Sequence, residues 1–143
     1  MSEVPIRLLL LTDEMEVGGT QRQIVELARG LDARRFDVTV LYFRERSFLV
    51  DSLEQSGVKV IQVPRHGRFD PSFVPRLART LAQHRFQVMH CFAFSGEFWG
   101  SLARSLLPRR QRPVLISSVR GTYEWYSGTE WMIKRWVTRQ SAL

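Results

Sequence analysis

Several features that mark other classes of protein are missing from this sequence. Its 143 residues contain a single cysteine, Cys91, which excludes an internal disulfide and a cysteine-based metal cluster. The longest apolar runs have the length of a strand, so the sequence predicts no transmembrane helix. No basic region precedes the short apolar run at the N-terminus, and no signal peptide is visible. These absences favour a cytoplasmic protein without a structural metal.

Lysine is also scarce. The formal charge of +7 comes from 19 arginines and only two lysines, Lys59 and Lys134. Such a charge favours anionic partners, namely nucleotides, phosphorylated sugars, acidic lipids or nucleic acids. Arginine can bind a phosphate through two parallel hydrogen bonds, whereas lysine acts as a point charge. A coding bias of the source genome would produce the same composition, so composition alone does not choose among these partners.

The stretch that organises the chain is its beginning. Ile6–Leu11 is an almost unbroken apolar run, typical of a strand that is buried on both faces. After Gly18 and Gly19, apolar residues recur with the spacing of one helical stripe. This stripe consists of Ile24, Leu27, Ala28 and Leu31. A strand therefore leads into a glycine turn that opens directly into a helix.

Two interpretations of Gly18 and Gly19 remain open. The pair can simply form a tight turn, which is the more frequent role of such a short motif. Alternatively, the missing side chains let a ligand approach the backbone, where the free N–H groups of the first helical turn point at it. A helix start of this kind attracts anions, phosphates above all.

Strands and helices alternate regularly along the rest of the chain. Further strands are predicted at Phe36–Phe43, Val58–Val63, Phe86–Phe92 and Val114–Val119. Helices are predicted after Ser47, near Ser72 with Pro75 in the first turn, after Ser95, and from about Thr129. The apolar stripe of the third predicted helix is Phe73, Leu77, Ala78 and Leu81, and that of the fourth is Trp99, Leu102, Ala103 and Leu106. This alternation predicts one α/β domain over residues 1–143, a three-layer Rossmann-like fold with a parallel five-stranded sheet in the order 3-2-1-4-5.

In such sheets, ligands bind beyond the carboxyl ends of the strands, where the strand order reverses. The residues at these ends are Asp13 and Glu14, Arg44 and Arg46, Arg65, His66 and Arg68, His90, and Arg120. We expect positive charge on this rim, and a crevice in which Gly18 and Gly19 face His90. His90 is either a hydrogen-bonded structural residue or a ligand-facing one. Asp13 and Glu14 are sequence neighbours that point in different directions, so they make an unconvincing acid–base pair.

The C-terminal tail mixes tryptophans with cations. The residues concerned are Trp125, Trp131 and Trp136 together with Lys134, Arg135 and Arg139. One interpretation is an interfacial membrane helix, with tryptophan at the headgroup level and the three cations on the polar side. The other, which we favour, is a helix whose aromatic residues pack on the sheet or on a missing domain. A missing domain would leave some of these tryptophans uncovered.

Taken together, these residues resemble the N-terminal domain of the retaining glycosyltransferases of family 4, which have the two-domain GT-B fold. The resemblance covers essentially the whole chain and rests on an ordered set of short patterns. They are the opening strand, Gly18-Gly19-x-Gln21, Leu27-Ala28-x-x-Leu31, Phe36-x-Val38-x-Val40, Val88-Met89-His90 and the strand from Pro113 to Val119.

The resemblance implies roles for four residues. Gly18 and Gly19 would face the diphosphate of the donor, and His90, the only candidate catalytic residue, would line the cleft near the reacting sugar. Arg120 stands where the family often has histidine, so it is a candidate for substrate binding rather than catalysis. A second departure is Gln87, which stands where the family often has aspartate.

The implied function is that of the acceptor-side domain of a glycosyltransferase in glycan biosynthesis. The donor would be a nucleotide diphosphate sugar and the acceptor a sugar or a lipid-linked sugar, with no cofactor and no metal. We expect the C-terminal donor-binding domain to be absent from this chain, which would then be inactive alone. The setting would be cytoplasmic, with room for peripheral contact at the inner face of the membrane.

The alternative is a stand-alone nucleotide-binding or basic interaction module without catalytic activity. A dinucleotide oxidoreductase is disfavoured because Gly-x-Gly-x-x-Gly is missing, and because the second strand ends in Phe43-Arg44 instead of an acidic residue that would bind ribose. Nucleic-acid binding would rest on net charge alone, since no helix-turn-helix or RNA-binding signature is present, and we expect none.

Overall fold

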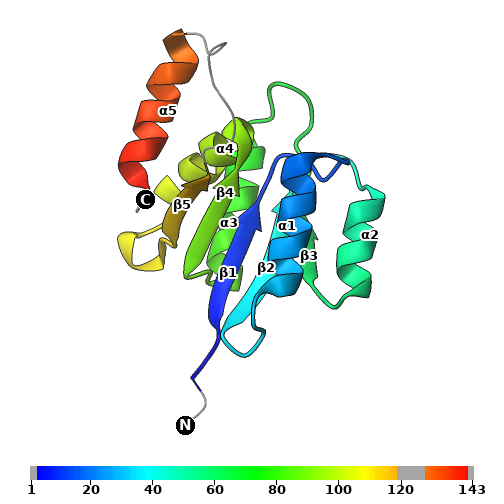
Figure 1. Ribbon diagram of the computed structural model, residues 1–143. Helices are drawn as coiled ribbons and strands as arrows, with labels where there is room; N and C mark the ends of the chain where they lie inside the picture. The colour runs from blue at the N-terminus through cyan, green and yellow to red at the C-terminus, as the bar shows by residue number, and fades with distance from the viewer. Residues whose placement is uncertain (1–2, 119–127, 142–143) are drawn as a thin grey trace.

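The structure, a computed structural model, describes residues 3–118 and 128–141. Arg120, Trp125 and the predicted end of the fifth strand at Val119 lie outside the described residues. The elements are β1 (Ile6–Leu11), α1 (Gly19–Gly30), β2 (Phe36–Tyr42), α2 (Phe48–Gln55), β3 (Lys59–Gln62), α3 (Phe73–His84), β4 (Val88–Phe92), α4 (Ala93–Ser105), a 3-10 turn η1 (Arg109–Gln111), β5 (Val114–Ser118) and α5 (Gly128–Gln140) (Figure 1).

The five strands form one parallel sheet in the order β3-β2-β1-β4-β5, as predicted. Residues 8–11 of the central strand β1 are buried on both faces, which explains the unbroken apolar run there. Leu10 packs with Ile24 of α1 on one face, and Leu9 packs with Leu77 of α3 on the other. Helices α1 and α2 therefore cover one face and α3 and α4 the opposite face (Figure 1).

Helix α4 approaches the sheet unusually closely because of two glycines. A Cβ atom on Gly96 would lie 3.2 Å from the carbonyl oxygen of Leu11, at the end of β1. A Cβ atom on Gly100 would lie 2.5 Å from Cδ2 of Leu11 and 3.0 Å from Sγ of Cys91. The missing side chains thus bring the first turns of α4 against the carboxyl ends of β1 and β4.

The start of α4 differs from the prediction. The helix begins at Ala93, directly after β4, and Phe92 occupies the N-cap position. The predicted cap Ser95 lies inside the helix, since Ala93 turns the chain at once with a φ of 61°. The predicted apolar stripe was only partly right: Ala103 is buried, but Leu106 is 59% exposed.

The starts of α2 and α3 agree better with the predictions from the sequence. Ser47 precedes α2 as predicted, but its hydroxyl donates to the carbonyl oxygen of Met15 instead of capping the helix. Helix α3 begins after Ser72. Pro75 lies in its first turn, where a backbone N–H would have no acceptor within the helix.

Helix α5 packs beside β5 and α4 (Figure 1). Its buried residues are Lys134 and Val137, while Trp131 is 45% and Trp136 is 37% exposed. Of the two packing partners that we expected for the aromatic residues, the sheet does not cover these two tryptophans, and packing on a missing domain stays a prediction. The sheet leaves them uncovered because of a buried ion pair: the Lys134 ammonium donates to a carboxylate oxygen of Glu97, a residue of α4 that is 1% exposed. No helix in the described ranges 3–118 and 128–141, α5 included, has the length and apolar character needed to cross a bilayer.

Candidate functional site

The loop between β1 and α1 reaches the carboxyl edge of the sheet at Gly18 and Gly19. Gly18 has an extended backbone with a φ of −161°, and Gly19 is the first residue of α1. Neither glycine has a positive φ, so the turn itself does not require them. A Cβ atom on Gly19 would meet no atom within 4 Å. Open space therefore lies in front of the first turn of α1, where its N–H groups point outward.

At position 18, in contrast, the packing of the loop itself requires glycine. A Cβ atom there would lie 2.5 Å from Oε1 of the Gln21 side chain, which folds back across the turn. Nε2 of Gln21 donates to the carbonyl oxygen of Glu14 at 3.4 Å, and the Thr12 hydroxyl donates to the same oxygen at 3.3 Å. The pattern Gly18-Gly19-x-Gln21 thus holds the loop in one shape and leaves its tip uncovered.

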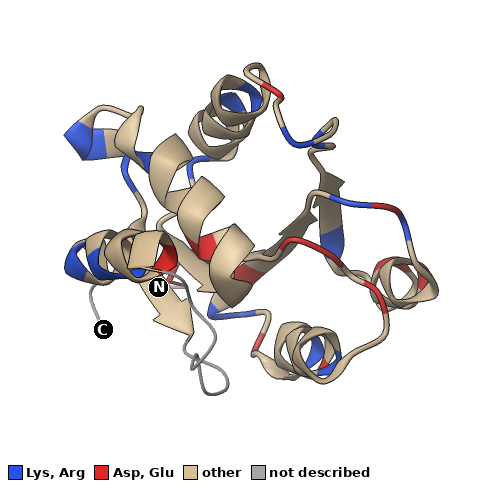
Figure 2. Ribbon diagram, turned by 90° about the horizontal axis from the view of Figure 1, so that it is seen from above, with Lys and Arg blue, Asp and Glu red and all other residues tan. Residues whose placement is uncertain are grey.

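The rim arginines are more fully paired than the sequence suggested. Arg44 lies 3.1 Å from Asp13 and 3.8 Å from Glu14, which ties the loop after β2 to the loop after β1. Figure 2 looks onto this edge and shows basic and acidic segments close together along the loops. The two carboxylates thus offset the charge of Arg44, one of the cations that we expected on the rim.

Arg46 is likewise paired, with carboxylates of the helix that follows it. Its guanidinium donates to Asp51 at 3.0 Å and to Glu54 at 3.3 Å, both on α2. Charged hydrogen bonds from Arg46 lower the pKa of Glu54. Arg46 therefore stabilises α2 locally and is not available to a ligand in this arrangement.

A hollow of about 440 Å³ lies beside these pairs, at the carboxyl ends of β2 and β3. Its lining includes Glu16, Gln62, Arg65 and His66. The Arg65 guanidinium lies 5.0 Å from the ring centre of Trp99 on α4, a cation–π contact that bridges two elements of the edge. The side chains that line the hollow include both hydrogen-bond donors and acceptors.

Asp70 holds the loop after β3 in place. Its carboxylate accepts hydrogen bonds from the Ser72 hydroxyl, the His66 N–H and the Arg76 guanidinium. The bonds from Ser72 and His66 lower the pKa of Asp70 to about 2. This residue was missed by the sequence reasoning, although Asp-x-Ser before a helix is a recognisable turn pattern.

His90 lies inside β4, two residues before the strand ends at Phe92. It pairs in register with Leu10 and Ile116, and its ring stacks on Phe92 at 4.2 Å between ring centres. Because register partners in parallel strands face the same side, His90 lies on the face that α1 covers. It is half-buried there. A shared ligand for His90 and Gly19 stays a prediction.

The described part of the chain offers neither a metal site nor a reactive cysteine. Residues 3–118 and 128–141 contain no group of three His, Cys, Asp or Glu side chains that could hold a metal ion. Cys91 is fully buried, and burial raises the pKa of its thiol, which makes it a poor nucleophile. Among these residues, the exposed N–H groups of α1 and the half-buried His90 remain the candidates.

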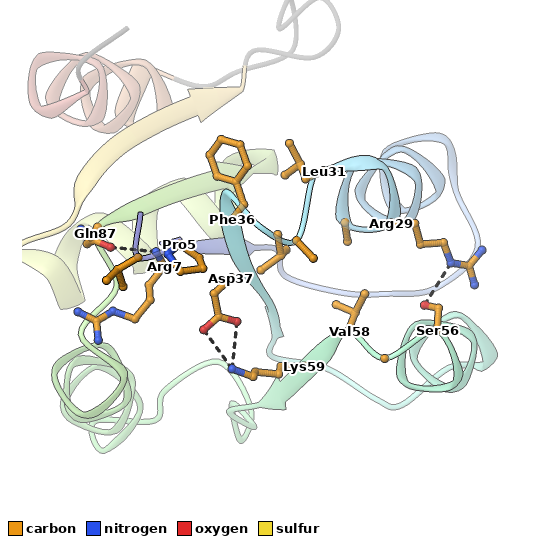
Figure 3. Close-up of a pocket in the computed structure, with 15 residues that line it drawn as sticks. Pro5, Arg7, Arg29, Leu31, Phe36, Asp37, Ser56, Val58, Lys59 and Gln87 are labelled. Carbon is orange, nitrogen blue, oxygen red and sulfur yellow. Dashed lines mark hydrogen bonds and ion pairs between the residues drawn. The ribbon is translucent and has the colours of Figure 1, made fainter. Parts of the chain in front are cut away.

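A larger hollow lies at the opposite, amino-terminal edge of the sheet (Figure 3). Its volume is about 860 Å³, but two pairs of its polar side chains are bound to each other. Asp37 lies 3.0 Å from Lys59, and the Arg29 guanidinium donates to Ser56 at 3.3 Å (Figure 3). Since ligands of such sheets bind at the carboxyl edge, we do not assign the functional site to this hollow.

Solved structures similar to this chain share its fold. HepE (Alr3699) from Anabaena, solved with UDP and also with UDP and glucose, matches with TM-scores of 0.75 and 0.74 and identities of 17% and 16%. These two matches cover 96% of this chain and 36–37% of HepE. A glycosyltransferase from Rickettsia africae matches with a TM-score of 0.63 and 16% identity, over 87% of this chain and 32% of that one.

The fold alone does not determine function. The C-terminal domain of a hydrogenase from Pyrococcus furiosus matches with a TM-score of 0.55 and 14% identity, over 84% of this chain and 98% of that domain. No curated protein sequence matches the chain significantly. The chain spans about a third of the length of HepE and of the glycosyltransferase from Rickettsia africae.

The sequence itself gives the more specific result. The family model described as Glycosyltransferase Family 4 matches residues 17–143, which begin one residue before Gly18 and extend to the last residue. The match thus includes the glycine turn, the histidine of β4 and α5. The chain belongs to glycosyltransferase family 4.

Proposed function

We propose that this chain forms the acceptor-side half of a glycosyltransferase that transfers a sugar from a nucleotide diphosphate sugar. The observation that carries the proposal is the open space in front of Gly19, at the start of a 12-residue helix. Neither the backbone conformation nor the packing requires glycine there. The missing side chain would let a phosphate group approach the helix N–H groups closely.

The two HepE structures support this assignment of the donor. One of them contains UDP, and the other contains UDP and glucose. In the proposed enzyme, the first turn of α1 would contact the diphosphate, and a second domain would hold the base and the ribose. The sugar would then lie between the two halves, with His90 near it as the candidate catalytic residue and Arg120 as a further substrate contact. No cofactor or metal enters this scheme.

The acceptor would occupy the hollow after β2 and β3, next to Arg65 and Gln62. A free sugar would fit this mixed polar lining, and so would the sugar end of a lipid-linked acceptor. In the second case the enzyme would work on the cytoplasmic side, in peripheral contact with the inner face of a membrane. Its role would be glycan biosynthesis.

Nucleotide binding to the chain should be weak and should depend on Gly19. A helix start contributes about 0.3–1 kcal/mol at an exposed site and up to about 2 kcal/mol when it is partly buried. Since Arg44 and Arg46 are already paired with carboxylates, we expect millimolar affinity or weaker. The measurement is an NMR titration of the chain with UDP and with GDP.

The variants Gly19→Val and Gly30→Val form a matched pair. Both glycines are terminal residues of α1, both are exposed, and a Cβ atom on either meets nothing within 4 Å. We expect Gly19→Val to abolish the nucleotide-induced shifts and Gly30→Val to preserve them. Micromolar binding that survives Gly19→Val, or sugar transfer by this chain alone, would contradict the proposal.

A further inference from the structure

A second hollow at the amino-terminal edge of the sheet, of about 600 Å³, lies between the start of β1, the end of α3 and the turn η1. Guanidinium groups dominate the part of its lining that the structure describes, which contains no aspartate or glutamate. The arginines are Arg7, Arg85, Arg110 and Arg112. They are far apart in sequence and come together because they lie at or just before the starts of β1, β4 and β5, which are neighbours in the sheet. We call this site the arginine hollow.

Three of these arginines have no carboxylate partner. Arg7 pairs in register with Asp37 of β2, but the Asp37 carboxylate is bound to Lys59 at 3.0 Å. The Arg7 side chain points away from this pair (Figure 3). No ion pair within residues 3–118 and 128–141 involves Arg7, Arg85 or Arg110. Their charges are therefore not neutralised by the described part of the chain.

The fourth arginine shapes the loop between α4 and β5. The Arg112 guanidinium donates to the backbone carbonyl oxygens of Leu107 at 2.9 Å and Ser105 at 3.0 Å. Both acceptors are neutral, so the charge of Arg112 remains. Its effect reaches Arg104, whose pKa is lowered by burial and by the nearby charge of Arg112. The hollow thus has a positive potential that neutral hydrogen-bond partners do not remove.

Gln87 lines the hollow with a neutral side chain. Its Oε1 accepts a hydrogen bond from the backbone N–H of Arg7 at 3.0 Å, and its backbone carbonyl oxygen accepts one from Val114 at 2.9 Å. A glutamate could accept the same bond from Arg7 and would add a carboxylate. The amide therefore joins the three strand starts without placing negative charge among the arginines.

Arg85 has a backbone conformation that favours glycine. It is the C-cap residue of α3, with a φ of 50° and a ψ of 48°. Glycine commonly ends a helix in this left-handed conformation, because a Cβ atom destabilises it. The chain has an exposed arginine there instead, and its side chain lines the hollow. Strained positions of this kind occur where a side chain serves a ligand.

The chemistry of the hollow indicates its ligand. A guanidinium group binds phosphate through two parallel hydrogen bonds, and three of them converge here without carboxylate partners. A volume of about 600 Å³ is that of a small-molecule site. A concave lining encloses a small anion, whereas a flat lipid surface cannot follow it. The site therefore fits a small molecule with several phosphate groups.

We propose that the arginine hollow binds a triphosphate chain, either free or as part of a nucleoside triphosphate. Arg7, Arg85 and Arg110 bind its phosphate groups. The hollow lies at the edge of the sheet opposite Gly18 and Gly19, so the two sites do not share a ligand position.

The test is an NMR titration of the chain with inorganic tripolyphosphate and with ATP at low ionic strength, read at the amides of residues 85–87 and 110–112. Three charge-assisted contacts correspond to roughly millimolar affinity. Both compounds should shift these amides, and the tighter of the two identifies the source of the chain. UDP carries fewer charges and should bind here more weakly.

Two neighbouring arginines of η1 provide matched variants. Arg109 and Arg110 are both exposed, but only Arg110 lines the hollow. Arg110→Gln should weaken tripolyphosphate binding about tenfold, the low end for a hydrogen bond to a charged group, and Arg109→Gln should stay within about twofold. Arg85→Gly should also cost about tenfold and should fold, since glycine suits the backbone there. Gln87→Glu should weaken binding at least as much, through repulsion by the added carboxylate.

Four outcomes would overturn the proposal. They are unshifted amides at residues 85–87 and 110–112, equal losses in Arg109→Gln and Arg110→Gln, undiminished binding in Gln87→Glu, and shifts of the same size with inorganic sulfate. Equal losses would indicate attraction to net charge, and the sulfate result would indicate an adventitious ion only. The nucleotide titration proposed above is read at the start of α1 and depends on Gly19. Either proposal can therefore fail without the other.

Discussion

Replacing Lys134 with methionine should destabilise this protein more than any substitution of an exposed residue. The variant keeps the approximate length of the side chain and removes its charge. Glu97, which is only 1% exposed, would then have a buried carboxylate that has lost the Lys134 cation. Breaking a buried pair by removing one partner costs about 3–5 kcal/mol. For a domain of about 150 residues this corresponds to a fall in Tm of roughly 6–20 °C.

The assay is urea-induced unfolding followed by circular dichroism, with the free energy of unfolding obtained by linear extrapolation. The matched control is Arg135→Met, which removes a cation from the exposed side of the same helix. Its effect should stay within about 0.5 kcal/mol. The double variant Glu97→Gln/Lys134→Met should recover most of the loss, because a neutral amide can still accept the bond from Ser117.

Two results would refute this reasoning. A cost below about 1 kcal/mol for Lys134→Met would mean that water reaches the Glu97 carboxylate in solution. A double variant as unstable as the single one would mean that the two side chains are not coupled, and that the loss comes from packing.

Two further predictions concern the edge of the sheet. Gly96→Ala should cost about 1–3 kcal/mol in urea unfolding, because its Cβ would lie 3.2 Å from the backbone oxygen of Leu11, whereas Gly128→Ala, with no atom within 4 Å, should not. Asp70 should titrate near pH 2 by NMR, and Ser72→Ala should raise its pKa toward the ordinary 3.8. Since the folded pKa is the lower one, the contribution of Asp70 to stability is complete above pH 3.8 and is lost as the pH falls through about 2.

Most of the fold could be predicted because each strand and helix buries a face that its own sequence displays. Residues 8–11 are apolar throughout because they lie in the central strand, and α3 shows its buried side in Phe73, Leu77 and Ala78. The start of α4 could not be predicted in the same way. It depends on a left-handed alanine at position 93, which the residue type disfavours.

The candidate site was predicted only in outline. Gly18 and Gly19 lie at the carboxyl edge as expected, since a strand followed by a helix must place its loop there. The pairing of Arg44 with Asp13 was not predictable, because it joins loops from two strands that become neighbours only in the sheet. The orientation of α5 was missed for the same reason, since Glu97 lies 37 residues before Lys134.

The engagement of both lysines has a consequence for how this protein can be regulated. Lys134 is buried against Glu97, and Lys59, paired with Asp37, is the one exposed lysine in the described part of the chain. Every other fixed cation is a guanidinium, which stays protonated at any pH compatible with folding. Acetylation of amines therefore has almost nothing to act on, and ordinary changes of pH leave the arginines charged. Ionic strength is the variable that remains to weaken the attraction of this surface for anions.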